Sequence, residues 1–143
     1  TPGNESKIIE LSDGSWMVNS RVNNSGYRYS HISIDFGNTW NSKKEIDLID
    51  PGCNGSLIRY NHNSHNLLLL SNINDQKERR ELVIRYSLDE GNSWSAPKII
   101  YREEAAYSSM AVLPNGDIGL FFEADNYRKN LFTRIKLDEI LNL

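Results

Sequence analysis

The residues that could do chemistry are a carboxylate, an arginine and a tyrosine in separate parts of the chain. Glu5 and Arg21 lie on either side of a predicted hairpin turn at Asp13-Gly14. A guanidinium binds a carboxylate by planar, charge-assisted, bidentate hydrogen bonds that lysine imitates poorly. Tyr107 begins a predicted strand, and a phenol with a pKa of about 10 needs a base to take its proton before it attacks. By residue type alone, these side chains are more often packing or solvated charges.

Metal and thiol chemistry is not expected. Cys53 is the single cysteine, which excludes an internal disulfide and leaves a zinc site without enough ligands. His62 and His65 flank a polar turn with no cysteine or acidic cluster, and His31 is no better placed. We therefore expect no metal and no cofactor.

The clearest pattern in the sequence is an eight-residue motif that occurs twice, at residues 33–40 and 87–94, 54 positions apart. Both copies read Ser-x-Asp-x-Gly-Asn-[Thr/Ser]-Trp. The aspartates Asp35 and Asp89 can accept backbone N–H groups of their own turns, so we interpret them as structural. A repeat of about 50 residues with turn chemistry at a fixed place predicts β-propeller blades.

Short apolar or alternating runs bounded by turn residues predict an all-β chain. A short polar strand is expected after Trp40, and residues 137–143 predict a helical turn or terminal strand. The other expected strands are 6–11, 16–21, 27–34, 56–60, 66–71, 82–87, 98–101, 108–113, 117–123 and 130–136. This layout divides the chain into about three blades, at residues 1–50, 51–103 and 104–143. Because a propeller needs four to eight blades, we expect only part of a ring.

Charge and hydropathy exclude some partners. The 16 basic and 19 acidic side chains give a net charge of −3, so no global field attracts nucleic acid or an anionic membrane. The sequence contains no run of about 18 apolar residues, so we expect no transmembrane helix, and we do not expect the first residues to form a signal peptide.

The repeated motif is the Asp-box, and four segments in order resemble the C-terminal half of the catalytic domain of bacterial exo-α-sialidases (neuraminidases). The resemblance covers nearly the whole chain. It implies a partial six-bladed propeller of the sialidase fold, with four-stranded antiparallel blades. The segments are residues 4–14 followed by 19–21, then 51–60, 79–85 and 106–123.

The resemblance also assigns roles to single residues. It implies that Tyr107 is the catalytic nucleophile and that Glu5 is the catalytic glutamate beside it. Arg21 matches one arginine of the family's carboxylate-binding triad. Arg79 matches another, with its neighbour Arg80 as the alternative.

The activity implied is hydrolysis of terminal α-linked sialic acids from glycoproteins, glycolipids and oligosaccharides, with retention. The substrate's own carboxylate would repel a carboxylate nucleophile, and sialidases are the glycosidases that use a tyrosine instead. In the family, the counterpart of Glu123 supports the first arginine of the triad. Because sialoglycans are extracellular, the resemblance implies an extracellular or periplasmic location.

Two elements of the family's site have no match in these 143 residues. The first triad arginine, in an Arg-Ile-Pro-like segment, and the aspartate that protonates the leaving group both belong to the N-terminal half of the propeller. We expect that half to be a necessary partner, and the chain alone to be inactive. Three alternatives remain: a trans-sialidase, a hydrolase of a related 2-keto sugar acid, and a non-catalytic Asp-box propeller that binds glycans or proteins.

Overall fold

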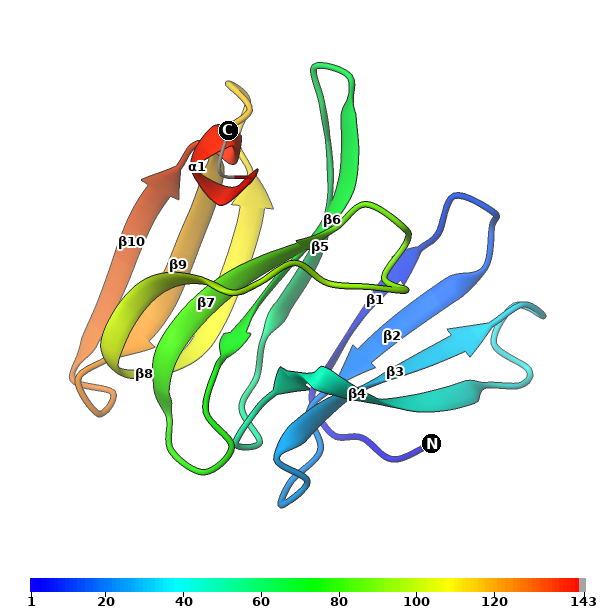
Figure 1. Cartoon of the computed structure of the whole chain (residues 1–143), viewed down its shortest axis with the longest axis horizontal. Helices are drawn as coiled ribbons and strands as arrows, with labels where there is room; N and C mark the ends of the chain where they lie inside the picture. Colours follow the sequence, from blue (N-terminus) through cyan, green and yellow to red (C-terminus); the bar gives the residue numbers. More distant parts are fainter. Residues whose placement is uncertain (142–143) are drawn as a thin grey trace.

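The computed structural model describes residues 1–141, and ten strands and one short helix make up its regular structure (Figure 1). All strand pairs are antiparallel, as expected for an all-β chain. The elements are β1 (Ser6–Glu10), β2 (Trp16–Ser20), β3 (Tyr27–Ser33), β4 (Asn41–Ile49), β5 (Ser56–His62), β6 (His65–Ile73), β7 (Arg80–Ser87), β8 (Lys98–Val112), β9 (Ile118–Ala124), β10 (Lys129–Ile135) and α1 (Leu137–Leu141).

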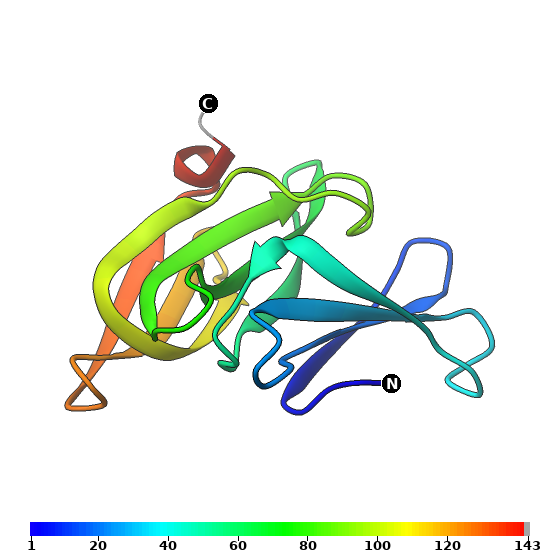
Figure 2. The same cartoon turned by 60° about the horizontal axis from the view of Figure 1, so that its bottom comes forward.

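The strands form two sheets that lie side by side (Figures 1 and 2). The first sheet has the order β1-β2-β3-β4, and the second has the order β10-β9-β8-β7-β6-β5. The second sheet curls because β8 pairs with β7 through its first half and with β9 through its second half. Strands that follow one another in antiparallel order confirm the expected all-β class, and this order fits the blades of a β-propeller.

Two strands differ from the prediction. The strand after Trp40 is nine residues long, because β4 lies at the edge of its sheet and buries few side chains, so a polar sequence can form it. β8 continues through residues 102–107, where no strand was expected, because its register shifts let one strand serve both halves of the sheet. The helical turn expected near the C-terminus is α1, and residues 142–143 of that prediction lie outside the described residues.

The middle of the structure is built on β6, whose two faces are both buried. Leu67 and Leu69 pack into the core of the curled sheet, whereas Leu68 and Leu70 pack against Leu11, Met17 and Leu48 of the first sheet. Side chains of a strand alternate between its faces, so a run of four leucines serves two cores. This packing fixes the two sheets against each other.

Both Asp-boxes stabilise their own turns. Asp35 accepts hydrogen bonds from the backbone and the hydroxyl of Thr39, at 2.8 and 2.6 Å. Asp89 accepts the same two bonds from Ser93, at 2.9 and 2.6 Å. The two aspartates therefore have the structural role that the motif predicts.

The tip of the second Asp-box also links the two sheets. Glu90 accepts hydrogen bonds from the backbone and hydroxyl of Ser12 at 3.0 and 2.9 Å, and it pairs with both terminal nitrogens of Arg59, at 3.0 and 2.6 Å. These bonds from Arg59 outweigh partial burial and, with those from Ser12, lower the pKa of Glu90 to about 2.

We predict that Glu90→Gln destabilises the fold by about 1–2 kcal/mol at neutral pH, because a charged contact between the sheets is lost. The folded-state pKa of Glu90 lies below its ordinary value of 4.5, so the contact contributes fully above pH 4.5 and is lost as the pH falls toward 2. Urea unfolding at pH 7 and pH 3 measures both effects.

The control is Glu103→Gln, since the Glu103 side chain is exposed and forms no ion pair or hydrogen bond within residues 1–141. An equal loss of stability in both variants, or a Glu90 effect that grows in acid, would contradict the role of this contact.

Candidate active site

Glu5, Arg21 and Tyr107 form one hydrogen-bonded cluster, although Glu5 and Tyr107 are 102 positions apart. The Tyr107 hydroxyl donates to Glu5 Oε1 at 2.6 Å. Arg21 Nη1 donates to the same hydroxyl at 2.9 Å and also pairs with Glu5 Oε2. A carboxylate is therefore in place to take the phenol's proton, and a cation is in place beside the phenol oxygen.

Local backbone structure brings the cluster together. Glu5 precedes β1 and Arg21 follows β2, and the Arg21 N–H donates to the Glu5 carbonyl at 3.0 Å, which extends the hairpin by one pair. Tyr107 lies in β8 at the register shift between Ala105 and Ser108. Such an irregularity re-aims a side chain, and here it follows the point where the strand passes from one partner to the other.

The electrostatics of the cluster keep the carboxylate charged and the phenol neutral. The hydrogen bond to Glu5, together with partial burial, raises the pKa of Tyr107 above its usual value. Partial burial acts to raise the pKa of Glu5, but hydrogen bonds from Tyr107 and Arg21 outweigh it and lower that pKa. Glu5 is thus an ionised base at neutral pH and Tyr107 a protonated phenol.

Arg79 lies over the ring of Tyr107. Its guanidinium carbon is 5.5 Å from the centroid of that ring and 6.0 Å from the centroid of Tyr127. Its Nη1 donates to the Tyr127 hydroxyl at 2.6 Å, and its Nη2 donates to the Gly52 carbonyl at 3.2 Å. Arg79 therefore adds a second guanidinium next to the cluster.

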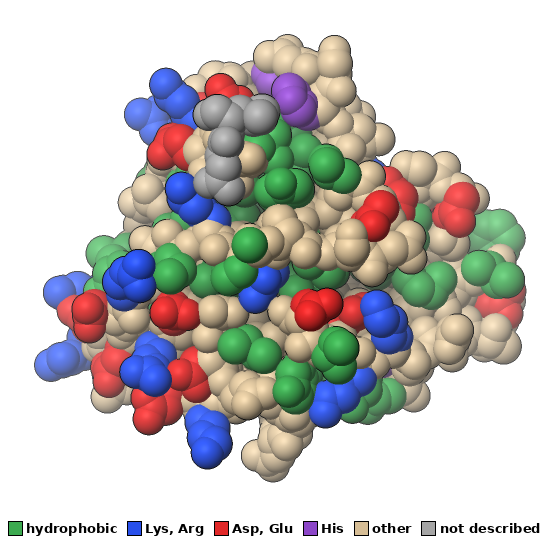
Figure 3. Space-filling model, viewed as in Figure 1, with side chains coloured by type: hydrophobic (Ala, Val, Ile, Leu, Met, Phe, Trp, Pro, Cys, Tyr) green, Lys and Arg blue, Asp and Glu red, His purple; other side chains and the backbone are tan. Residues whose placement is uncertain are grey.

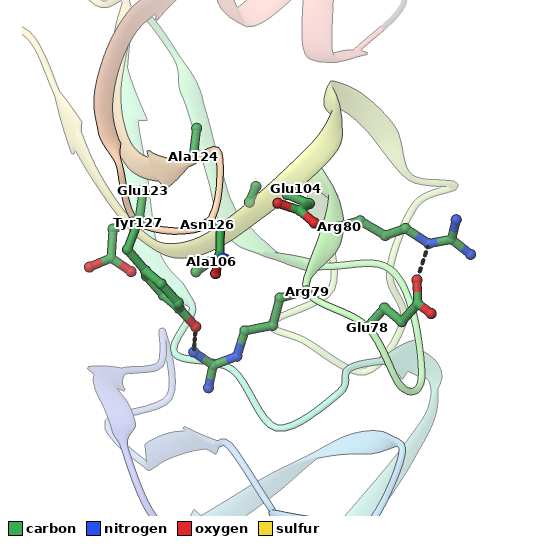
Figure 4. Close-up of a pocket in the computed structure, with 10 residues that line it drawn as sticks. Glu78, Arg79, Arg80, Glu104, Ala106, Glu123, Ala124, Asn126 and Tyr127 are labelled. Atoms are coloured by element: carbon green, nitrogen blue, oxygen red, sulfur yellow. Dashed lines mark hydrogen bonds and ion pairs between the residues drawn. The ribbon is translucent and has the colours of Figure 1, made fainter.

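Arg80, the alternative to Arg79, points elsewhere (Figure 4). Its Nε pairs with Asp75 at 2.9 Å and with Glu78 at 3.4 Å, and its side chain is 57% exposed. The Arg80 side chain thus lies against the surface loop that precedes β7 and pairs there with Asp75 and Glu78, away from the cluster of Glu5, Arg21 and Tyr107.

Glu123 lies behind the tyrosine. Its Oε2 accepts the backbone N–H of Tyr107 at 3.2 Å. The carboxylate also lines a cavity of about 360 Å³, together with Arg79, Ala106, Asn126 and Tyr127. Glu5, Arg21 and Tyr107 do not line this cavity, but two of its lining residues, Arg79 and Glu123, contact Tyr107 and so connect the cavity to the cluster.

Three residues to which the sequence analysis assigned no role hold the arginines. Asn23 Oδ1 accepts the Nε–H of Arg21 at 2.8 Å, and Gly52 and Tyr127 bind Arg79. Gly52 has φ +87°, and a Cβ there would lie 3.1 Å from the Asn23 oxygen. The Arg-x-Asn spacing was a usable signal for Asn23, whereas a carbonyl contact such as that of Gly52 has no sequence signature.

Other kinds of site were also sought. Within residues 1–141, no group of three or more His, Cys, Asp or Glu side chains is placed to hold a metal ion. No helix in that range is both long and apolar enough to cross a membrane. On the face shown in Figure 3, acidic and basic side chains are interspersed, and neither forms a continuous patch.

Curated sequences similar to this chain are sialidases. The sialidase of Micromonospora viridifaciens is 36% identical over 127 residues, which cover 83% of this chain and 20% of that protein. The sialidase of Bacteroides fragilis is 30% identical over 146 residues, which cover 96% of this chain and 27% of that protein. The chain thus spans between a fifth and about a quarter of these two relatives.

Solved structures similar to this one are also sialidases or trans-sialidases. The Hadza microbial sialidase Hz136 matches with a TM-score of 0.83 and 27% identity, over 96% of this chain and 28% of that chain. The intramolecular trans-sialidase of Ruminococcus gnavus, solved with oseltamivir carboxylate, matches with a TM-score of 0.76 and 26% identity, over 94% of this chain and 33% of that chain. These matches confirm a partial propeller of the sialidase fold.

A family model described as a BNR repeat-like domain matches residues 4–120. This range includes both Asp-boxes and Tyr107. The sequence resemblance to sialidases is therefore confirmed, and the chain belongs to the BNR repeat-like domain family.

Proposed function

We propose that this chain supplies the C-terminal half of the active site of an exo-α-sialidase, which removes terminal α-linked sialic acids from glycoconjugates with retention. The observation that carries the proposal is the hydrogen bond from the Tyr107 hydroxyl to Glu5, with Arg21 on the same phenol oxygen. A neutral tyrosine with its own base and a neighbouring cation is an activated nucleophile. The sialidases among the chain's relatives support this reading.

The substrate's carboxylate would be bound by the arginines. A sialic acid carries this carboxylate on its anomeric carbon, and guanidinium groups match its planar geometry. Arg21 and Arg79 lie on two sides of Tyr107, so both would hold the carboxylate next to the attacking oxygen. The same negative charge explains why the nucleophile is a phenol, since a second carboxylate would repel it.

The reaction would proceed in two steps. In the first, the Tyr107 oxygen bonds to the anomeric carbon, Glu5 takes the phenol's proton, and the glycosidic bond breaks. The leaving oxygen takes a proton from an acid in the other half of the propeller. In the second step, the deprotonated acid accepts a proton from a water molecule. The water oxygen bonds to the anomeric carbon and displaces the Tyr107 oxygen, which recovers its proton from Glu5. Two inversions at one carbon give net retention.

Glu123 would support the first arginine of the carboxylate-binding triad, which joins Arg21 and Arg79. Its carboxylate lines the cavity beside Arg79, and the backbone of Tyr107 holds it in place. A guanidinium from the N-terminal half of the propeller, entering this cavity, would pair with Glu123 and lie close to Arg79. That half is the proposed partner, and an extracellular or periplasmic location follows from the substrate.

We predict that Arg79→Gln weakens binding of N-acetylneuraminic acid by about tenfold or more, because one charge-assisted contact to the carboxylate is lost. Arg80→Gln is the matched control and should change the affinity less than about twofold. NMR titration of the 143-residue chain measures both dissociation constants. Equal effects of the two substitutions, or a larger effect at Arg80, would contradict the assignment of Arg79.

A second prediction concerns the nucleophile. We expect 2,3-difluorosialic acid to form a covalent adduct on Tyr107, because a fluoride leaving group needs no proton and the reaction is independent of the acid. Mass spectrometry of the intact chain and its peptides detects the adduct. Tyr107→Phe and Glu5→Gln should abolish it, whereas Tyr86→Phe should leave it unchanged. An adduct on another residue would remove Tyr107 from the proposed role.

A third prediction is that the 143-residue chain does not hydrolyse a fluorogenic sialoside. Its sequence matches two of the three clamp arginines and lacks a counterpart of the leaving-group acid. If the chain released the fluorophore faster than buffer alone, and Tyr107→Phe abolished this release, the chain would hydrolyse sialosides without the N-terminal half of the propeller.

A trans-sialidase is the second candidate, favoured by the match to the trans-sialidase of Ruminococcus gnavus. It would share the arginine clamp and the tyrosine and differ in the acceptor, so lactose added as acceptor to the complete enzyme separates the two. A glycan-binding propeller without catalysis explains the Asp-boxes equally well. It gives no reason for a glutamate to accept a hydrogen bond from a tyrosine that an arginine also contacts.

A further inference from the structure

We propose that Tyr127 is a positioning residue that holds Arg79 in place for the substrate's carboxylate. This inference rests on the proposed function and adds a residue to it. Tyr127 lies at the tip of the hairpin between β9 and β10, outside the segments that resemble sialidases. Figure 4 shows its hydroxyl directed at the guanidinium of Arg79 across the cavity.

The first argument is how Arg79 is held. Its Nη1 donates to the Tyr127 hydroxyl at 2.6 Å and its Nη2 to the Gly52 carbonyl at 3.2 Å. Both acceptors are neutral, and within residues 1–141 Arg79 forms no ion pair with a carboxylate. Arg21, in contrast, is paired with Glu5. Arg79 is therefore fixed without being neutralised, which suits a cation that must bind an anionic ligand.

The second argument is the backbone of the loop. Asp125, Asn126 and Tyr127 have φ values of 51°, 52° and 65°. Asp and Asn adopt the left-handed region readily, but Tyr127 does so at a cost of roughly 1–2 kcal/mol, so other contacts must hold the loop in this conformation.

Asp125 provides the contacts that hold the loop. Its carboxylate accepts from the Tyr101 hydroxyl at 3.1 Å and pairs with Lys129 at 2.5 Å. Its backbone N–H donates to the Glu104 carbonyl at 3.1 Å. The loop is thus anchored to β8 and β10, which leaves Tyr127 at its tip, aimed at Arg79.

Tyr127 could also act as a gate, if its hydroxyl occupied the carboxylate's position and had to leave before binding. The hydrogen-bond inventory favours positioning. A guanidinium has five N–H donors, and the contacts to Tyr127 and Gly52 use two of them. Three donors remain, and a bidentate carboxylate needs two.

The experiment uses Tyr127→Phe in the 143-residue chain, which removes the hydroxyl and keeps the ring. Tyr86→Phe is the matched control, because the Tyr86 hydroxyl makes no hydrogen bond within the described residues. Two quantities are measured: the order parameter of the Arg79 Nε–Hε group by ¹⁵N relaxation, and the dissociation constant for N-acetylneuraminic acid. Thermal melting checks that both variants are folded.

We expect Tyr127→Phe to lower the Arg79 order parameter and to weaken sialate binding about three- to tenfold, with no such change in Tyr86→Phe. An unchanged order parameter and affinity would overturn the inference, and tighter binding would replace positioning by gating. If the wild-type chain binds no sialate, Arg21 and Arg79 do not by themselves form a carboxylate site, and the role of Tyr127 toward the carboxylate is rejected. The relaxation data then still decide whether Tyr127 holds Arg79.

Discussion

The buried ion pair between Arg28 and Asp50 is the interaction on which the rest of the structure depends. Each side chain is 1% exposed, and their closest atoms are 2.9 Å apart. Arg28 comes from β3 and also donates to the Cys53 carbonyl, while Asp50 accepts the backbone N–H groups of Gly52 and Cys53. Loss of one partner would leave a buried charge uncompensated, which costs about 3–5 kcal/mol. The pair fixes the turn at residues 50–53 where the two sheets meet.

That turn sets the spacing of the two arginines. The Gly52 carbonyl accepts a hydrogen bond from Arg79, and Gly52 packs against Asn23, which accepts one from Arg21. Two like charges are therefore held close together by neutral oxygen acceptors, and only Arg21 is compensated, by Glu5. The proposed carboxylate site needs uncompensated positive charge, and the contacts of Arg79 with two neutral oxygens are consistent with that proposal.

The curled sheet supplies the third part of the site. β8 begins beside β7 and ends beside β9, and Tyr107 lies where the register shifts. This places the phenol over the gap between the two sheets, within hydrogen-bonding distance of residues from the first hairpin. The aspartates of the two Asp-boxes take no part in this, since they bind their own turns. They stabilise the sheets that the site joins.

Much of this protein followed from the sequence: the all-β class, the Asp-box turns, and the set of Glu5, Arg21, Arg79 and Tyr107, which the resemblance named and the structure brings together. Turn chemistry and strand alternation are local, so a linear sequence records them. The length of β8, the direction of Arg79 against that of Arg80, and the contacts of Gly52 and Tyr127 are not local. These features depend on which surfaces meet when the two sheets pack. Arg79 and Arg80 are the same residue type at neighbouring positions, so only the partners that packing brings to each side chain distinguish their roles.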